Sequence, residues 1–174
     1  MPKSYDYAQR QGELRIDWER FAALSKGLAE RLAGHVDVVV GVARAGLLPA
    51  TAVACALRLD LVPVQVTRRE ADRVVREEPL WKVDVSREVE GRAVAVVDEI
   101  ADTGRTLALV AERVRARGAA EVVTATLVAH TWASPPPDVA ALESDALVIF
   151  PWDARVLVDG RWTLHPELSA AREP

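Results

Sequence analysis

The chain has 174 residues and a mass of 19.0 kDa; half of its residues are hydrophobic and 28% are charged. This length fits one domain that buries its own core. The formal net charge of −4 and the pI near 5.5 exclude the strongly basic balance of a dedicated nucleic-acid binder. No apolar run reaches the roughly 20 residues needed to cross a bilayer. We expect a soluble, cytoplasmic protein with no membrane or nucleic-acid partner.

Helical and strand-like patterns alternate along the chain. Apolar residues spaced three and four apart predict a helix from Asp17 to Ala33 and two more at 47–59 and 107–117. Apolar, mostly β-branched runs predict strands at 36–42, 61–66, 92–97, 121–129 and 146–150, with a short strand at 81–85. This alternation implies right-handed βαβ units, so the predicted fold class is α/β with a mostly parallel sheet.

The segment after the predicted strand at 92–97 carries the clearest chemical pattern. Asp98 and Glu99 are followed by the string Asp102-Thr103-Gly104-Arg105-Thr106, which opens a helix. Backbone N–H groups at a helix start, a glycine and two threonine hydroxyls form a cradle for an anion such as phosphate. Neighbouring carboxylates would repel that anion unless they meet ribose hydroxyls or a divalent cation. The alternative is structural: the acids merely end a strand, and Asp102 or Thr103 caps the helix.

The string from Val96 to Leu107 resembles the phosphoribosyl-pyrophosphate (PRPP) signature of type I phosphoribosyltransferases. Residues 41–50 look like the pyrophosphate loop of that family, and the charged segment 67–80 resembles its hood over the active site. Residues 148–153 are similar to the end of the purine-using branch, the xanthine-guanine and hypoxanthine enzymes. The resemblance implies one domain over 1–174 with a core at about 36–153, and a hood formed by the N-terminal helix and the C-terminal tail.

The resemblance also implies roles for residues of the turn. Asp98 and Glu99 would bind the ribose hydroxyls, and Glu99 would also contact a PRPP-bound Mg²⁺. Asp102 would act as the general base toward the purine. The 5′-phosphate would be held by Ala101, Asp102, Thr103, Gly104, Arg105 and Thr106.

The pyrophosphate would be contacted by Arg44, Ala45 and Gly46. Relatives often hold the peptide at Ala45 in cis, and the sequence leaves that point open. Positive charge on the hood would come from Arg68, Arg69, Arg73 and Arg76, whose alternative role is that of solvated loop residues.

The base-binding part departs from the family pattern. His130 stands where purine enzymes usually have a lysine that donates to the 6-oxo group, and Leu147 stands where an aromatic ring usually stacks on the base. Val148 and Trp152 complete the expected base site, although Trp132 and Trp152 are equally explained as packing residues. Asp153 would bind a second Mg²⁺ through water or close the pocket. His35 and His165 are interpreted as surface or packing residues.

The function implied by the resemblance is Mg²⁺-dependent transfer of phosphoribose from PRPP to hypoxanthine, guanine or xanthine, in purine salvage. Two alternatives remain open at this point. One is a PRPP-sensing regulatory protein of the same fold, and the other is a phosphoribosyltransferase for an acceptor that is not a 6-oxopurine. The resemblance also implies a homo-oligomer, a dimer or a tetramer. The sequence does not fix the acceptor base.

Overall fold

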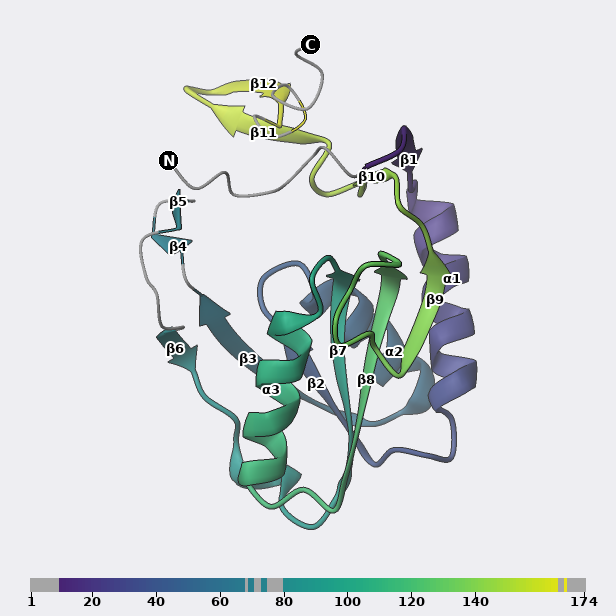
Figure 1. Cartoon of the computed structure of the whole chain (residues 1–174), viewed down its shortest axis with the longest axis vertical. Coiled ribbons are helices and arrows are strands. Elements are labelled where there is room, and N and C mark those ends of the chain that lie inside the picture. The colour runs from purple at the N-terminus through teal and green to yellow at the C-terminus, as the bar shows by residue number, and fades with distance from the viewer. Residues whose placement is uncertain (1–9, 68, 71–72, 75–79, 166–167, 169–174) are drawn as a thin grey trace.

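The computed structural model describes residues 10–67, 69–70, 73–74, 80–165 and 168. Its centre is a six-stranded sheet in the order β6-β3-β2-β7-β8-β9 (Figure 1). The strands are β2 (Val38–Val42), β3 (Asp60–Thr67), β6 (Leu80–Val83), β7 (Ala93–Ala101), β8 (Glu121–Ala129) and β9 (Val139–Glu143). All neighbours in this sheet are parallel except β3 and β6, which are antiparallel. The predicted α/β class with a mostly parallel sheet is confirmed.

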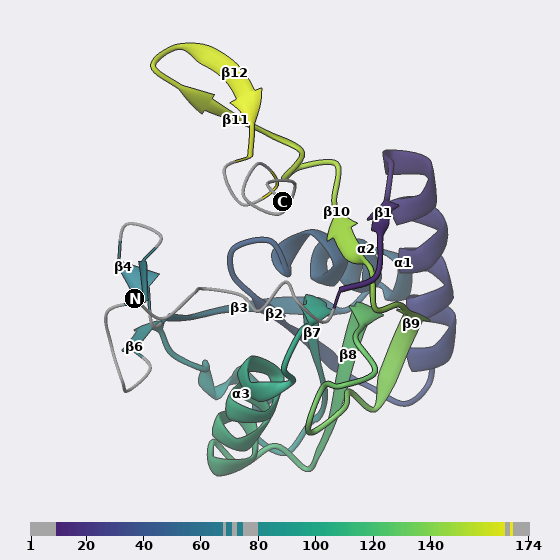
Figure 2. The same ribbon diagram turned by 45° about the horizontal axis from the view of Figure 1, so that its top comes forward.

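Three helices cover the two faces of the sheet: α1 (Trp18–Leu32), α2 (Leu47–Leu57) and α3 (Arg105–Ala116). Figure 2 shows α3 on one side and α1 with α2 on the other. The alternation of side chains along a strand explains this arrangement. In β2, Val39 packs with α1 and α2, whereas Val38 and Val40 pack with α3. Both faces of β2 are therefore buried, which is why its residues are β-branched except for Gly41.

The N-terminal helix forms where the sequence predicts it. The Asp17 carboxylate accepts a hydrogen bond from the Arg20 backbone N–H at 2.8 Å and caps the helix. Leu28 and Leu32 are fully buried against the sheet, and the helix packs against α2, β8 and β9. This helix thus belongs to the core layer, whereas the sequence analysis assigned it to the hood.

Several strands differ from the predicted ones. β7 continues to Ala101 because Asp98, Ile100 and Ala101 keep pairing with β8, so the two acids lie on the strand and not in a loop. β3 begins at Asp60 and includes Pro63. β9 was not predicted, and the predicted strand at 146–150 became β10 (Leu147–Ile149), which pairs in parallel with β1 (Glu13–Arg15) outside the central sheet.

Smaller elements lie beyond the edges of the sheet. Two short strands, β4 (Arg69–Glu70) and β5 (Arg73–Val74), pair within the predicted hood segment; Arg68 and Arg76 fall outside the described residues. A short 3-10 helix, η2 (Arg87–Val89), precedes β7. Strands β11 (Arg155–Val158) and β12 (Arg161–Leu164) form a hairpin that projects beyond the sheet (Figures 1 and 2). None of the helices in the described part of the chain is long and apolar enough to span a bilayer.

Candidate active site

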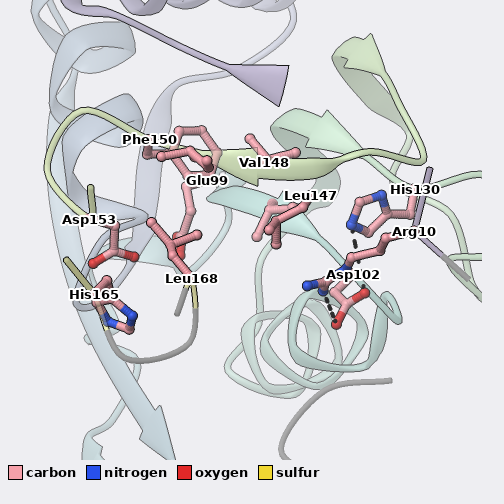
Figure 3. A pocket seen from close by; sticks show the side chains of 12 residues that line it. Arg10, Glu99, Asp102, His130, Leu147, Val148, Phe150, Asp153, His165 and Leu168 are labelled. Atoms are coloured by element: carbon pink, nitrogen blue, oxygen red, sulfur yellow. Dashed lines mark ion pairs between the residues drawn. The ribbon is translucent and has the colours of Figure 1, made fainter. Parts of the chain in front are cut away.

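A pocket lies between the carboxyl ends of β7 and β8 and strand β10. It brings together six residues that the sequence analysis selected: Glu99, Asp102, His130, Leu147, Val148 and Asp153. In Figure 3, Asp102 and His130 lie at one end of the pocket, Asp153 lies at the other, and Leu147 lies between them. The pocket thus joins an acidic and polar end to an aliphatic wall.

Six lining residues were not predicted as site residues: Arg10, Ile100, Ile149, Phe150, His165 and Leu168. Arg10 is far from its ion-pair partner Asp102 in the sequence and belongs to no motif, so local sequence patterns contain no signal for it. His165 lines the pocket opposite Asp102 (Figure 3), although the sequence analysis interpreted it as a surface or packing residue.

Asp102 is the most connected carboxylate of the pocket. Its Oδ2 lies 3.5 Å from Arg10 Nη2, and its Oδ1 accepts a hydrogen bond from Trp132 Nε1 at 3.4 Å. His130 Nε2 lies 3.8 Å from the same Oδ1. The Asp102 side chain retains 25% exposure, so it remains accessible to a ligand while its neighbours hold its orientation. This combination suits a group that takes a proton from a bound molecule.

His130 is held rigidly at the end of β8. Its Nδ1 lies 2.5 Å from the carbonyl oxygen of Ser144, and its backbone N–H donates to Ala101 at 3.1 Å. Trp132 stacks on the imidazole with ring centroids 4.3 Å apart. The side chain is fully buried, yet its Nε2 has no hydrogen-bond partner among the described residues. The position expected to face the base therefore carries an unsatisfied polar atom.

The two acids of β7 lie in different environments. Glu99 is half-buried and lines the pocket, whereas Asp98 is 8% exposed and is not part of the lining. Burial, with the nearby Glu99 as a smaller cause, raises the pKa of Asp98 well above its usual value. The Asp98 carboxylate accepts from the Glu99 backbone N–H at 2.9 Å. Its role toward a ribose stays a prediction.

The turn between β7 and α3 has the geometry of an anion cradle. Gly104 adopts φ +78° and forms the N-cap of α3, where no described side chain supplies a capping hydrogen bond. Thr103, Arg105 and Thr106 are exposed. The first backbone N–H groups of this 12-residue helix are thus available to a ligand. Because the helix dipole is positive at this end, these groups favour a negatively charged ligand.

The predicted pyrophosphate loop lies beside the acids. A Cβ placed on Gly46 would lie 2.4 Å from Asp98 Oδ1, so only glycine lets this loop approach β7 so closely. Arg44 is exposed, and the cis peptide of this loop joins Ala43 to Arg44, one bond before the peptide that the sequence left open.

Trp152 is not among the residues that line the pocket. Its ring stacks on Phe150 at 4.8 Å and meets Phe21 edge-on at 5.3 Å, in a cluster that also contacts Trp18. A contact between Trp152 and a base therefore stays a prediction, and its observed neighbours are those of a packing residue.

The carboxylates of Glu99 and Asp153 are candidate magnesium ligands because both line the pocket. No group of three or more metal-ligating side chains occurs among the residues that the structure describes. Magnesium sites that form around a substrate phosphate commonly use only one or two carboxylates and several waters. The donor set therefore fits a cation that arrives with a phosphorylated substrate.

Comparisons with known proteins agree with this arrangement. The model of the family described as "Phosphoribosyl transferase domain" matches residues 17–158. The chain is 29% identical over 152 residues to xanthine-guanine phosphoribosyltransferase of Nitratidesulfovibrio vulgaris, covering 81% of this chain and 85% of the relative. It is 28% identical over 143 residues to the enzyme of the same name from Idiomarina loihiensis, covering 81% and 87%. A crystal structure of purine phosphoribosyltransferase from Pyrococcus horikoshii superposes with a TM-score of 0.75 at 29% identity, covering 84% of this chain and 98% of that chain.

Proposed function

Because the chain belongs to the phosphoribosyl transferase domain family, we propose that it transfers the 5-phosphoribosyl group of PRPP to a purine base, for purine salvage. The products are a nucleoside monophosphate and pyrophosphate. The names of the similar proteins support a purine acceptor, and we take hypoxanthine, guanine and xanthine as its candidates. The observation that carries the proposal is that Asp102 belongs both to the anion cradle and to the wall of the pocket.

In this proposal, each part of the two substrates contacts a different set of residues. The turn from Ala101 to Thr106 would hold the 5′-phosphate through backbone N–H groups and threonine hydroxyls. Asp98 and Glu99 would hold the ribose hydroxyls, and the loop at 44–46 would contact the pyrophosphate. Leu147 and Val148 would cover one face of the base, since both line the pocket beside Asp102.

The chemical step is a displacement at the anomeric carbon of the ribose. A ring nitrogen of the base forms the new bond to that carbon while the bond to the pyrophosphate oxygen breaks, and the base proton passes to the Asp102 carboxylate. Mg²⁺, held by Glu99 and Asp153, would neutralise charge on the leaving pyrophosphate when it is bound. Arg10 and Trp132 keep the Asp102 carboxylate in place through the contacts given above.

The direct test is incubation with PRPP and Mg²⁺ against a panel of bases, with pyrophosphate release as the readout. We expect release with purines and none with orotate or uracil. Binding of PRPP without release for every base would refute transfer and favour a PRPP-sensing protein.

Asp102 is tested by the change Asp102→Asn, which keeps the shape of the side chain but removes its capacity to take a proton. We expect turnover to fall by about 10²- to 10⁴-fold, with PRPP affinity changed much less. Glu30→Gln on the exposed face of α1 is the matched control, since it removes an exposed carboxylate that lies 3.8 Å from the Lys26 ammonium. Equal losses of turnover and PRPP affinity would contradict a role for Asp102 as proton acceptor.

We also propose that the protein is a homo-oligomer. Leu157 and Trp162 on the β11–β12 hairpin are 59% and 65% exposed, which supports an association surface. Sedimentation velocity on the full chain tests this, and a monomer at micromolar concentration would refute it.

A further inference from the structure

The end of the pocket away from Asp102 is formed by the part of the chain that follows the β11–β12 hairpin. His165 and Leu168, here called the C-terminal wall, line the pocket there together with Asp153 (Figure 3). The family model matches residues 17–158, so both residues of this wall lie beyond the matched region. The pocket thus has a wall that the region shared with the family does not supply.

The β11–β12 hairpin brings the chain back to the pocket. Its two strands are antiparallel, with Arg155 opposite Leu164 at the open end. The pairing continues by one residue, because His165 N donates to Ala154 O at 3.4 Å. Ala154 directly follows Asp153 in the sequence, so the hairpin returns the chain to a residue that already lines the pocket.

Backbone hydrogen bonds fix the position of Leu168 in this wall. Its N–H donates to the carbonyl oxygen of His165 at 2.9 Å. On the other side of the hairpin, Asp153 N donates to Phe150 O at 3.1 Å, which ties the start of the hairpin to the end of β10. The Leu168 side chain is only 6% exposed. An apolar side chain is therefore held against the pocket by main-chain contacts.

Leu168 is an apolar residue in the half of the pocket that also contains two carboxylates. Glu99 and Asp153 line the same pocket, and in Figure 3 they lie with Leu168 on the side away from Asp102. A leucine side chain neither donates nor accepts hydrogen bonds, so it cannot bind the hydroxyls of a sugar. Its contribution is to occupy volume that water would otherwise fill next to these carboxylates.

Water competes with the base for the anomeric carbon of PRPP. In this side reaction the water oxygen forms a bond to that carbon, the bond to the pyrophosphate oxygen breaks with its electron pair, and one proton of the water passes to solvent. The products are ribose 5-phosphate and pyrophosphate, and no nucleotide is made. Expelling water from an active site suppresses side reactions of this kind.

We propose that Leu168 excludes water from the ribose end of the pocket and thereby directs PRPP to transfer and away from hydrolysis. This proposal rests on the proposed function, because it takes Glu99, together with Asp98, to hold the ribose hydroxyls. It deepens that function by assigning the choice between two reactions to a residue beyond the matched region. Leu168 acts through its volume, whereas Asp102 acts on the proton of the base, so the effects of the two residues are separable.

A graded series at position 168 tests this role. The wild type and the variants Leu168→Met, Leu168→Val and Leu168→Ala are incubated with PRPP, Mg²⁺ and whichever of hypoxanthine, guanine and xanthine the wild type uses best, and the ratio of ribose 5-phosphate to nucleotide is measured. Methionine conserves the volume, so it should keep the wild-type ratio. Alanine leaves space for at least one water, about 30 Å³, and we expect the ratio to rise about tenfold, with valine in between. The control Leu157→Ala makes the same change at a hairpin residue that is 59% exposed, and it should keep the wild-type ratio.

A ratio that rises with the volume removed supports the inference. Losses of transfer and hydrolysis in equal proportion, with the ratio unchanged, would show that Leu168 only supports the structure and would overturn the inference. A similar rise of the ratio in Leu157→Ala would overturn it as well, because the effect would not arise at the pocket. The methionine and valine variants decide the question if the alanine variant does not fold. In each of these cases purine transfer by the wild type stands, whereas a wild type that makes neither nucleotide nor ribose 5-phosphate refutes the proposed function and the inference with it.

Discussion

Gly104 is the residue of the anion cradle at which an added methyl group should lower stability and ligand affinity most. It adopts φ +78°, and an added Cβ would lie 2.0 Å from the Pro135 carbonyl oxygen and 3.1 Å from its carbonyl carbon. The change Gly104→Ala therefore imposes both an unfavourable backbone conformation and an overlap with another backbone segment. That segment cannot move freely because Ser134 N donates to Thr103 O at 3.0 Å.

The expected loss in the free energy of unfolding has two contributions. A non-glycine residue in the left-handed region costs about 1 kcal/mol. Moving the Pro135 backbone away adds about 2 kcal/mol, from overpacking and weakening of the Ser134 hydrogen bond. We expect Gly104→Ala to lower the free energy of unfolding by about 3 kcal/mol, measured by urea denaturation. We also expect it to weaken ribose 5-phosphate binding at least about tenfold, since it displaces the turn that we propose holds the phosphate.

Gly34 supplies the matched control. Its φ is +77°, nearly that of Gly104, but no atom lies within 4 Å of an added Cβ. Gly34→Ala should therefore show only the conformational cost, about 1 kcal/mol, and leave ribose 5-phosphate binding unchanged. If the two variants lose the same stability and bind the sugar phosphate equally well, the close approach of Pro135 to the turn does not hold in solution.

Two further predictions concern residues around the site. Gly46→Ala would place its Cβ 2.5 Å from Val42 O and 2.4 Å from Asp98 Oδ1, so PRPP binding measured by calorimetry should weaken more than about tenfold and the free energy of unfolding should fall by about 2 kcal/mol. The control Gly27→Ala in α1, with open space around the added Cβ, should instead stabilise the protein by about 0.5 kcal/mol. PRPP binding equal to wild type in Gly46→Ala would contradict the packing argument. Hydrogen bonds from Arg113 lower the pKa of Asp84 to about 2, so this pair stabilises the fold above pH 3.8 and loses its effect as the pH falls toward 2. Asp84→Asn should cost about 1 kcal/mol at pH 7, a value reduced for solvent screening, and the gap to wild type in urea denaturation should close between pH 4 and pH 2; a gap independent of pH would show that the ion pair does not contribute.

The central sheet was largely predictable because its strands are buried on both faces. β8 runs from Glu121 to Ala129 as expected, and α1 ends within one residue of each predicted boundary. Burial of both faces leaves continuous β-branched runs, and an amphipathic helix leaves a period of three and four. Such signals are local, so a single sequence contains them.

Strand β9 could not be read in the same way. Its sequence, Val-Ala-Ala-Leu-Glu, has a low intrinsic preference for a strand. It is aligned by Asp138, whose carboxylate accepts from the Thr124 backbone N–H and hydroxyl at 2.8 Å each. That contact joins residues 14 positions apart and leaves no periodic trace.

The β11–β12 hairpin, unlike β9, could have been predicted, because the sequence contains the residues of its turn. Asp159 and Gly160 both have positive φ, 48° and 74°, as a two-residue hairpin turn requires. An Asp-Gly pair between short apolar runs indicates this turn, and the sequence analysis described the region only as a mixed tail.

One segment after β8 connects the two halves of the candidate site. His130 N donates to Ala101 O at 3.1 Å and Ser134 N donates to Thr103 O at 3.0 Å, so this segment is fixed to the anion cradle at two points. The same segment supplies His130 and Trp132, which contact Asp102 at the wall of the pocket. Displacement at the anomeric carbon requires the sugar and the base to be held within a fraction of an ångström of the reactive distance. Because one segment is hydrogen-bonded to the turn proposed to hold the phosphate and also supplies side chains of the proposed base site, we expect that distance to be set by these backbone hydrogen bonds.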